Sequence, residues 1–188
     1  PIQMGDDKRQ AQLQKLVSPF ILRRTKKQVL KDLPDKVEKD LWLNLSPEEK
    51  QLYLANLAQV NEQLQQQLEL EQVDSILILA MMTRLRQICC EPRMLYENYT
   101  GESTKFKMCL DLIETLKEND KKVLLFSSFT SIFDSFIEEF DRRGIKYHMI
   151  TGAVDKKKRK EEVDAFQSDD SNVFLISLKA GGTGLNLT

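Results

Sequence analysis

Residues 172–188 read NVFLISLKAGGTGLNLT, and this segment decides the fold. Its residues 173–178 form an apolar run that only Ser177 interrupts, which is typical of a strand buried on both faces of a parallel sheet. The following loop, residues 179–184, is rich in glycine, and glycine lets backbone N–H groups approach a phosphate closely. The spacing matches neither the phosphate-binding lysine loop nor the dinucleotide-binding fingerprint. A strand-to-helix turn without a ligand is therefore an open alternative.

Helices and short strands alternate through the residues that precede this segment. We expect helices at residues 104–119, 131–143 and 155–167, and strands at residues 122–126 and 147–150. Strand–helix–strand alternation with short links predicts a parallel sheet flanked by helices. Ligands of such sheets bind at the carboxyl ends of the strands. Hydroxyl groups and glycines follow the strands here, at residues 127–130, 151–153 and 179–184.

The first hundred residues have a mostly helical pattern. We expect a helix at residues 6–17 and, from alternating apolar residues, a half-buried strand at residues 36–45. Ser46, Pro47 and Glu49 then form the start of a helix, with a capping box. This helix becomes rich in glutamine over residues 59–72, and a second helix follows at residues 75–90. The two favour a projecting helical arm, with a disordered linker as the alternative.

The composition limits the classes of function that the chain can have. Its 188 residues suffice for one domain or one and a half. Its 28 basic and 29 acidic residues nearly cancel, so any nucleic-acid site must be a local patch. Cys89, Cys90, Cys109 and the single His148 lack the spacing of a metal site, and we interpret the thiols as core residues in a reducing compartment. No apolar run approaches the length of a membrane span.

Four collinear segments resemble the second RecA-like lobe of SWI/SNF-class superfamily 2 helicases. These are PFILRRTKKQVLKDLP at residues 19–34, LRQICCEPRML at residues 85–95, KVLLFSSFT at residues 122–130 and the segment 172–188. The resemblance implies an α/β, RecA-like parallel sheet with flanking helices. It also implies a brace at residues 1–35, a motor lobe at residues 36–188 and a helical protrusion at about residues 47–92.

The resemblance further implies a function as one motor lobe of an ATP-dependent double-stranded-DNA translocase of the chromatin-remodelling type. The family's first lobe, with its lysine loop and acidic magnesium motif, has no counterpart here, and neither has its sixth motif. ATP and Mg²⁺ would therefore be bound by the parent protein, and we expect this chain alone to bind neither and to hydrolyse no ATP. Its partners would be duplex DNA, which it binds weakly alone, and the missing lobe. Self-association through an incomplete sheet edge is a further expectation, as is an intracellular location.

Site residues follow from the matching motifs. The resemblance places Ser127, Thr130, Lys179 and Arg159 against DNA phosphates, and it assigns no catalytic residue and no metal ligand. Residues expected at the inter-lobe cleft are Gly181, Gly182, Thr183, Gly184 and Asn186, and those expected in the brace are Arg23 and Arg24. The family more often has arginine at position 179 and leucine at position 183, which weakens the role of the Thr183 hydroxyl.

Each assignment has a simpler alternative. Thr130 or Ser131 would act only as a helix cap, and the basic run at residues 156–160 only as a solvated helix face. Trp42, the single tryptophan, is expected to pack beneath the helical arm, with base stacking as the alternative. Two other functions stay open: a non-catalytic interaction module that uses the glutamine-rich arm, and an RNA helicase lobe, which the LRQICCEP helix and the insertion at residues 46–92 disfavour.

Overall fold

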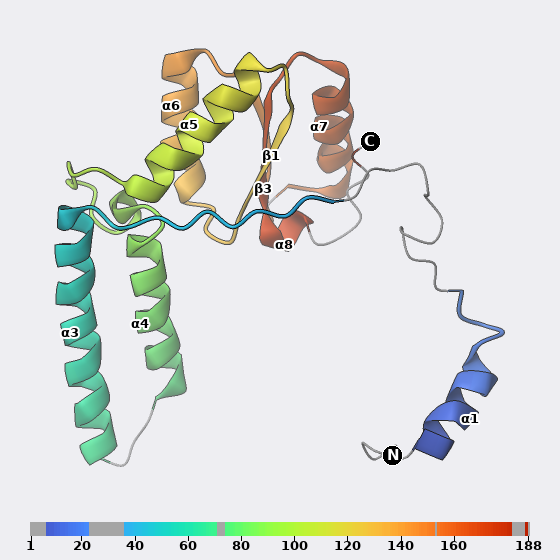
Figure 1. The fold of residues 1–188 in the computed structure, drawn as a ribbon, viewed down its shortest axis with the longest axis horizontal. Helices are drawn as coiled ribbons and strands as arrows, with labels where there is room; N and C mark the ends of the chain where they lie inside the picture. The colour runs from blue at the N-terminus through green and yellow to red at the C-terminus, as the bar shows by residue number, and fades with distance from the viewer. Residues whose placement is uncertain (1–6, 23–35, 71–73, 153, 182–186, 188) are drawn as a thin grey trace. The chain divides into compact units, whose positions relative to one another are not determined.

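The computed structural model describes residues 7–22, 36–70, 74–152, 154–181 and 187 (Figure 1). The chain divides into two compact units, Pro1–Leu41 and Trp42–Thr188. Helix α1 (Asp7–Val17) lies in the first unit, close to the bounds predicted from the sequence, and none of its eleven residues is buried. The second unit holds the sheet and therefore the candidate site.

The second unit alternates helices and strands in the order that the sequence predicts. It contains α3 (Pro47–Glu69), α4 (Ser75–Ile88), the short 3-10 helix η1 (Pro92–Met94), α5 (Thr104–Glu118), β1 (Val123–Ser127), α6 (Ile132–Arg143), β2 (Tyr147–Ile150), α7 (Lys156–Ser168), β3 (Val173–Ser177) and α8 (Leu178–Gly181). Helix α6 ends as expected, with Arg142 and Arg143 in its last turn and Gly144 in the left-handed conformation, at φ 61°.

The three described strands form a parallel sheet in the order β1-β3-β2. Val173 of β3 lies opposite Val123 of β1 on one side and Tyr147 of β2 on the other. All five residues of β3 are buried, because this strand has a neighbour on each side and helices over both faces. The central position that the apolar run predicted for this strand is confirmed, and so is the α/β fold.

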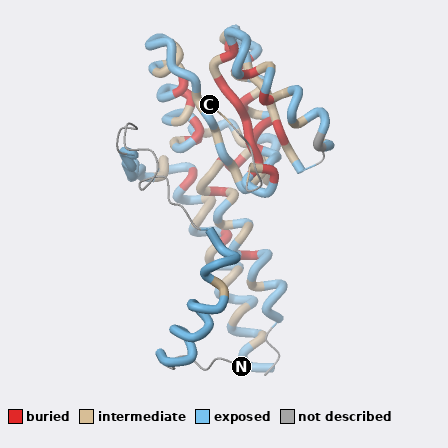
Figure 2. The backbone as a smooth tube through the Cα atoms, turned by 90° about the vertical axis from the view of Figure 1, so that its right-hand side faces the viewer, coloured by how far each residue is buried: buried red, intermediate tan, exposed pale blue. Residues whose placement is uncertain are grey.

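Two hydrophobic cores lie on opposite faces of the sheet. Phe133, Phe136 and Phe140 of α6 pack with residues of α5 against Val173 and Leu175. On the other face, α7 and α8 pack against the alternate residues of β2 and β3; these core residues are Ile150, Val163, Phe166, Phe174, Ile176 and Ala180. Figure 2 shows that the buried backbone is concentrated in the strands and in the helices beside them. Covering helices thus hold the strand ends in fixed positions.

Strand β1 is an edge of the described sheet and is incompletely covered. It pairs with β3 alone, and Leu124 and Phe126 are 40% and 46% exposed. Both lie on the face that α7 covers over β2 and β3. An apolar strand edge of this kind can pair with another chain, so self-association stays a prediction of the sequence.

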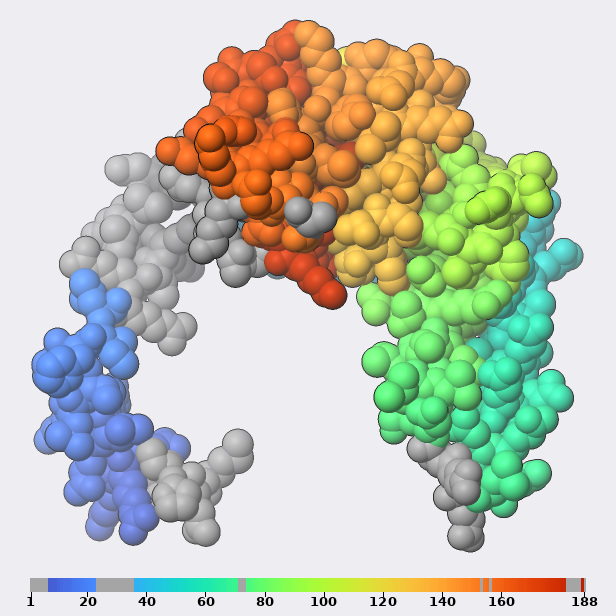
Figure 3. Space-filling model, turned by 180° about the vertical axis from the view of Figure 1, so that it is seen from behind, coloured from blue at the N-terminus to red at the C-terminus, as the bar shows by residue number. Residues whose placement is uncertain are grey.

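Helices α3 and α4 form the projecting arm, which excludes the disordered-linker alternative for the residues that the structure describes (Figure 3). The predicted capping box is present: the Ser46 hydroxyl accepts from the Glu49 N–H, and the Glu49 carboxylate accepts from the Ser46 N–H. Further along the arm, Arg84 donates to the Asn56 side-chain oxygen at 3.0 Å and to the Tyr96 hydroxyl at 3.1 Å. These bonds join both helices to the body of the unit.

Two predictions about the segment before α3 are wrong. Residues 36–45 have no strand pairing among the described residues, and most of them are exposed. Alternating apolar residues make a strand only where a neighbouring strand accepts their hydrogen bonds, and the pattern alone cannot supply that neighbour. Trp42 is 91% exposed, so it does not pack beneath the arm.

Candidate nucleic-acid interface

The carboxyl ends of the three parallel strands bring separate parts of the sequence to one edge of the sheet. Ser127 ends β1, Ile150 ends β2 and Ser177 ends β3, and Ser127 is directly opposite Ser177. Helices α6 and α7 begin a few residues after β1 and β2, and α8 follows β3 directly. The N–H groups of a first helical turn have no partner within the helix, and such turns attract phosphates.

The turn after β1 leads into helix α6, whose N-terminus has no side-chain cap. The Ser127 hydroxyl accepts from the Phe129 N–H at 3.0 Å and donates to the Phe129 carbonyl at 2.9 Å, so it closes the turn and does not face outward as a free phosphate donor. Thr130 is exposed, and Ser131 at the N-cap of α6 makes no side-chain cap. The Ser131 side chain therefore does not cap α6, and the Phe133 N–H donates instead to the Thr130 carbonyl at 3.0 Å. The exposed Thr130 and the remaining N–H groups of this first turn keep their capacity for a ligand.

The turn after β2 already carries an anion of its own. Asp155 caps α7 by accepting from the Lys158 N–H at 2.9 Å, which leaves less room for a phosphate at that N-terminus. The Arg159 guanidinium donates through Nε to the Val154 carbonyl at 3.0 Å, so the structure gives Arg159 a local bracing contact. Gly152 is exposed and has open space around it. Positive charge here comes from the exposed Lys157, Lys158 and Lys160.

The turn after β3 passes directly into α8 and carries an exposed cation. Lys179 is exposed, while its neighbour Ala180 is fully buried and donates through its N–H to the Ser177 hydroxyl at 3.3 Å. Gly181 has a steric reason to be glycine: a Cβ there would lie 2.9 Å from both Ile176 and Phe126. The remaining residues predicted for the loop and the brace lie outside the described residues; they are Gly182, Thr183, Gly184, Asn186, Arg23 and Arg24.

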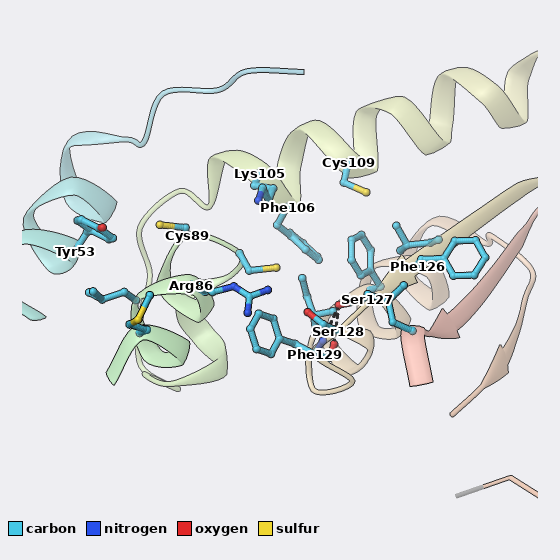
Figure 4. Close-up of a pocket in the computed structure, with 17 residues that line it drawn as sticks. Tyr53, Arg86, Cys89, Lys105, Phe106, Cys109, Phe126, Ser127, Ser128 and Phe129 are labelled. Carbon is cyan, nitrogen blue, oxygen red and sulfur yellow. Dashed lines mark hydrogen bonds between the residues drawn. The ribbon is translucent and has the colours of Figure 1, made fainter. Parts of the chain in front are cut away.

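A cavity of about 550 Å³ lies beside the turn after β1, between that turn and helices α4 and α5 (Figure 4). The Arg86 guanidinium of α4 lies 5.5 Å from the centre of the Phe129 ring, a cation–π distance. Figure 4 shows Arg86 pointing toward this ring, with Ser127 and Ser128 beyond it. The contact between the arm and the turn was missed from the sequence, because Arg86 and Phe129 lie in segments that are distant in sequence.

Three half-buried thiols also line the cavity. Burial raises the pKa of Cys89 and Cys90, and it raises the pKa of Cys109 to about 11. Thiols with raised pKa values are poor nucleophiles and poor metal ligands at neutral pH. No cluster of metal-ligating side chains is found within the described part of the chain. Cys90 and Cys109 pack against the hydrophobic core beneath α5 and α6.

Two family models match adjacent parts of the chain. The model described as the SNF2-related domain matches residues 1–94, half of the chain. The model described as the helicase conserved C-terminal domain matches residues 104–188. The boundary between the matches falls shortly before α5. Among the described helices, none is both long and apolar enough to cross a membrane.

Relatives similar to this chain include ATP-dependent helicases and chromatin regulators. An uncharacterised ATP-dependent helicase of Mycoplasma pneumoniae is 35% identical over 94% of this chain and 17% of its own length. The mouse SWI/SNF-related matrix-associated actin-dependent regulator of chromatin subfamily A member 1 is 31% identical over 98% of this chain and 18% of its own length. The chain thus spans less than a fifth of the length of these two relatives.

A solved structure similar to this chain is that of the SWI2/SNF2 ATPase core of Sulfolobus solfataricus in complex with double-stranded DNA. It is 27% identical, with a TM-score of 0.67, over 94% of this chain and 39% of the solved chain. A solved structure of the Sulfolobus solfataricus SWI2/SNF2 ATPase core domain is 29% identical, with a TM-score of 0.69, over all of this chain and 40% of the solved chain. The predicted resemblance is confirmed.

Proposed function

The chain belongs to the SNF2-related helicase family, and we propose that it contributes the second motor lobe of an ATP-dependent translocase on duplex DNA. The observation that carries this proposal is the carboxyl edge of the sheet. There, the uncapped N-terminus of α6 and the exposed Lys179 follow two strands that lie side by side. Both are suited to hold the sugar–phosphate backbone, and neither reads a base.

Each residue at this edge has a distinct proposed part in DNA binding. The Thr130 hydroxyl and the first N–H groups of α6, other than that of Phe133, donate to a phosphate. Lys179 neutralises the same phosphate or the next one along the strand. Ser127 acts indirectly, because its hydroxyl fixes the turn that presents those N–H groups. Arg159 braces the loop before α7 and adds positive charge near the DNA.

ATP hydrolysis is proposed for the larger protein and not for this chain alone. The sequence contains no Gly-x-x-x-x-Gly-Lys-Ser/Thr loop, which neutralises the phosphates in such enzymes. ATP with Mg²⁺ would supply the driving chemistry from a cleft between two lobes. We propose that Gly181, Gly182, Thr183, Gly184 and Asn186 face that cleft. Residues 1–35, with Arg23 and Arg24, would brace the lobes, and residues 36–188 would form this lobe.

A variant of Lys179 tests the DNA contact. We expect the wild-type chain to bind duplexes of unrelated sequence weakly and with a steep dependence on salt. Lys179→Ala should lower the affinity and flatten the slope of log K against log salt by about one unit, because one phosphate contact is lost. Fluorescence anisotropy with labelled duplexes between 50 and 200 mM salt, roughly the range over which such contacts weaken, measures both quantities.

The matched control is Lys121→Ala. Lys121 is also exposed but lies at the opposite edge of the sheet, just before β1. The Lys121→Ala substitution removes the same charge from the chain. A salt slope that changes equally in both variants would show an effect of net charge and would mean that Lys179 does not contact the DNA.

The second candidate function, a protein-interaction module, is favoured by the arm. Ile76, Leu79 and Met82 of α4 are 81%, 64% and 55% exposed, and their spacing places them along one side of the helix. Exposed apolar side chains of this size are typical of protein interfaces. A chain that binds no duplex even at low salt would favour this candidate over the motor lobe.

A further inference from the structure

Both ring nitrogens of His148 are bound to carboxylates. His148 lies on β2, and its Nδ1 is 2.7 Å from Oε2 of Glu162 on α7. Its Nε2 is 2.8 Å from Oδ2 of Asp169, the residue at the C-cap of the same helix. The imidazole therefore joins the edge strand of the sheet to two places on α7.

The proton count of this group identifies the charge of the ring. An ionised carboxylate only accepts hydrogen bonds, and a neutral imidazole carries a single N–H, so it donates to one partner at most. Two bonds to two carboxylates need both ring nitrogens protonated. The geometry thus corresponds to a positively charged His148 between two negatively charged partners.

Packing around the ring keeps these groups together. The imidazole packs in a T-shaped arrangement with the rings of Phe166 and Phe174, whose centroids are each 6.1 Å away, and 16% of the His148 side chain is exposed. The other charged groups nearby have partners of their own: Lys122 donates to the carbonyls of Phe166 and Asp169. Lys146 pairs with Asp170 at 2.6 Å.

We propose that His148 is a pH-dependent clamp that fastens α7 to the sheet when the ring is charged and releases one of its two carboxylates when the ring is neutral. Helix α7 carries the basic residues near the carboxyl edge of the sheet, so the attachment of α7 affects where these charges lie. The proposal does not depend on DNA binding.

The directions of the pKa changes agree with this geometry. Burial lowers the pKa of His148, but the hydrogen bonds and charges of Asp169 and Glu162 outweigh burial and raise it above the ordinary 6.5. The pKa of Asp169 lies well below its usual range, because the Ser171 hydroxyl and His148 both donate to it. The contribution of His148 to the free energy of unfolding is therefore fully present below pH 6.5, and it is lost as the pH rises through the folded-state pKa of His148. The contribution of Asp169 to stability is present above its ordinary pKa of 3.8 and is lost in stronger acid.

Proton NMR tests the clamp directly, because the chain contains one histidine and so one set of imidazole signals. We expect the His148 pKa to lie above 6.5 in the wild-type chain and to fall toward that value in Glu162→Gln. The control Glu161→Gln removes the same charge one residue away, from an exposed side chain, and should leave the His148 pKa nearly unchanged. A pKa at or below 6.5, or equal values in all three proteins, would overturn the clamp.

A measurement on the unmutated chain guards against a variant that fails to fold. Long-range ¹⁵N–¹H correlation at pH 6 reports whether both ring nitrogens carry protons, and we expect two protonated nitrogens. Urea unfolding between pH 5.5 and 8.5 should show that wild type loses stability as the pH rises, and that His148→Gln does not. The expected loss is an increase of about two- to five-fold in the unfolding equilibrium constant of wild type. One unprotonated ring nitrogen at pH 6, or parallel pH profiles for the two proteins, would contradict the proposal.

Discussion

Replacing Glu49 by alanine is expected to destabilise the second unit by about 3 kcal/mol, because several buried hydrogen bonds to one carboxylate are lost together. Glu49 is fully buried and accepts from the Ser46 N–H at 2.8 Å, the Thr104 N–H at 3.1 Å and the Thr104 hydroxyl at 2.7 Å. The same carboxylate therefore closes the capping box of α3 and attaches the arm to the start of α5. Its removal leaves the half-buried N–H groups of Ser46 and Thr104 without this partner.

Urea unfolding followed by circular dichroism measures this loss. The matched control is Glu48→Ala, which removes the same side chain from the preceding, exposed position of the same helix. We expect the control to change the unfolding free energy by less than about 0.5 kcal/mol. Equal effects of the two substitutions would show that the capping box and the Thr104 contacts contribute little.

Replacing Phe140 by alanine is expected to cost about 4 kcal/mol, the largest effect of any substitution considered for this chain. Phe140 is fully buried, and its ring lies 5.7 Å from that of Phe136 and 5.8 Å from that of Tyr147. It thereby joins α6 to β2, and α6 begins at the turn proposed to bind phosphate. The cavity left by the ring would lower the free energy of unfolding, and it would also hold the turn before α6 less firmly in place.

The control for this core variant is Phe20→Ala, at a position that is 88% exposed. The same atoms are removed without a cavity, so the unfolding free energy should be nearly unchanged. Thermal or urea unfolding of both variants at one pH makes the comparison. A Phe140→Ala chain as stable as wild type would mean that α6 is not anchored by this ring.

Local chemistry explains why much of the fold is readable from the sequence. The apolar run Val173–Ile176 of β3 implies burial on both faces, and the strand is central. The Ser46 cap and the Gly144 end of α6 are also local signals, because each depends on residues within one turn of the helix. Predictions of this kind need no knowledge of distant residues.

The features that were missed depend on residues distant in sequence. The alternation at residues 36–45 resembles a strand, but a strand needs a partner that no local pattern supplies. Arg86 reaches Phe129 from a separate helix, so neither segment alone indicates their contact.

The central claim is that the carboxyl edge of the sheet faces duplex DNA, and hydrogen–deuterium exchange with and without duplex tests it most directly. We expect binding at low salt to slow exchange in residues 127–133 and 177–181, which contain the turn after β1, the first turn of α6 and Lys179. Residues 119–122 and 144–146, at the opposite edge, should exchange at the same rate with and without DNA. Protection confined to that opposite edge, or to the arm formed by α3 and α4, would contradict the account.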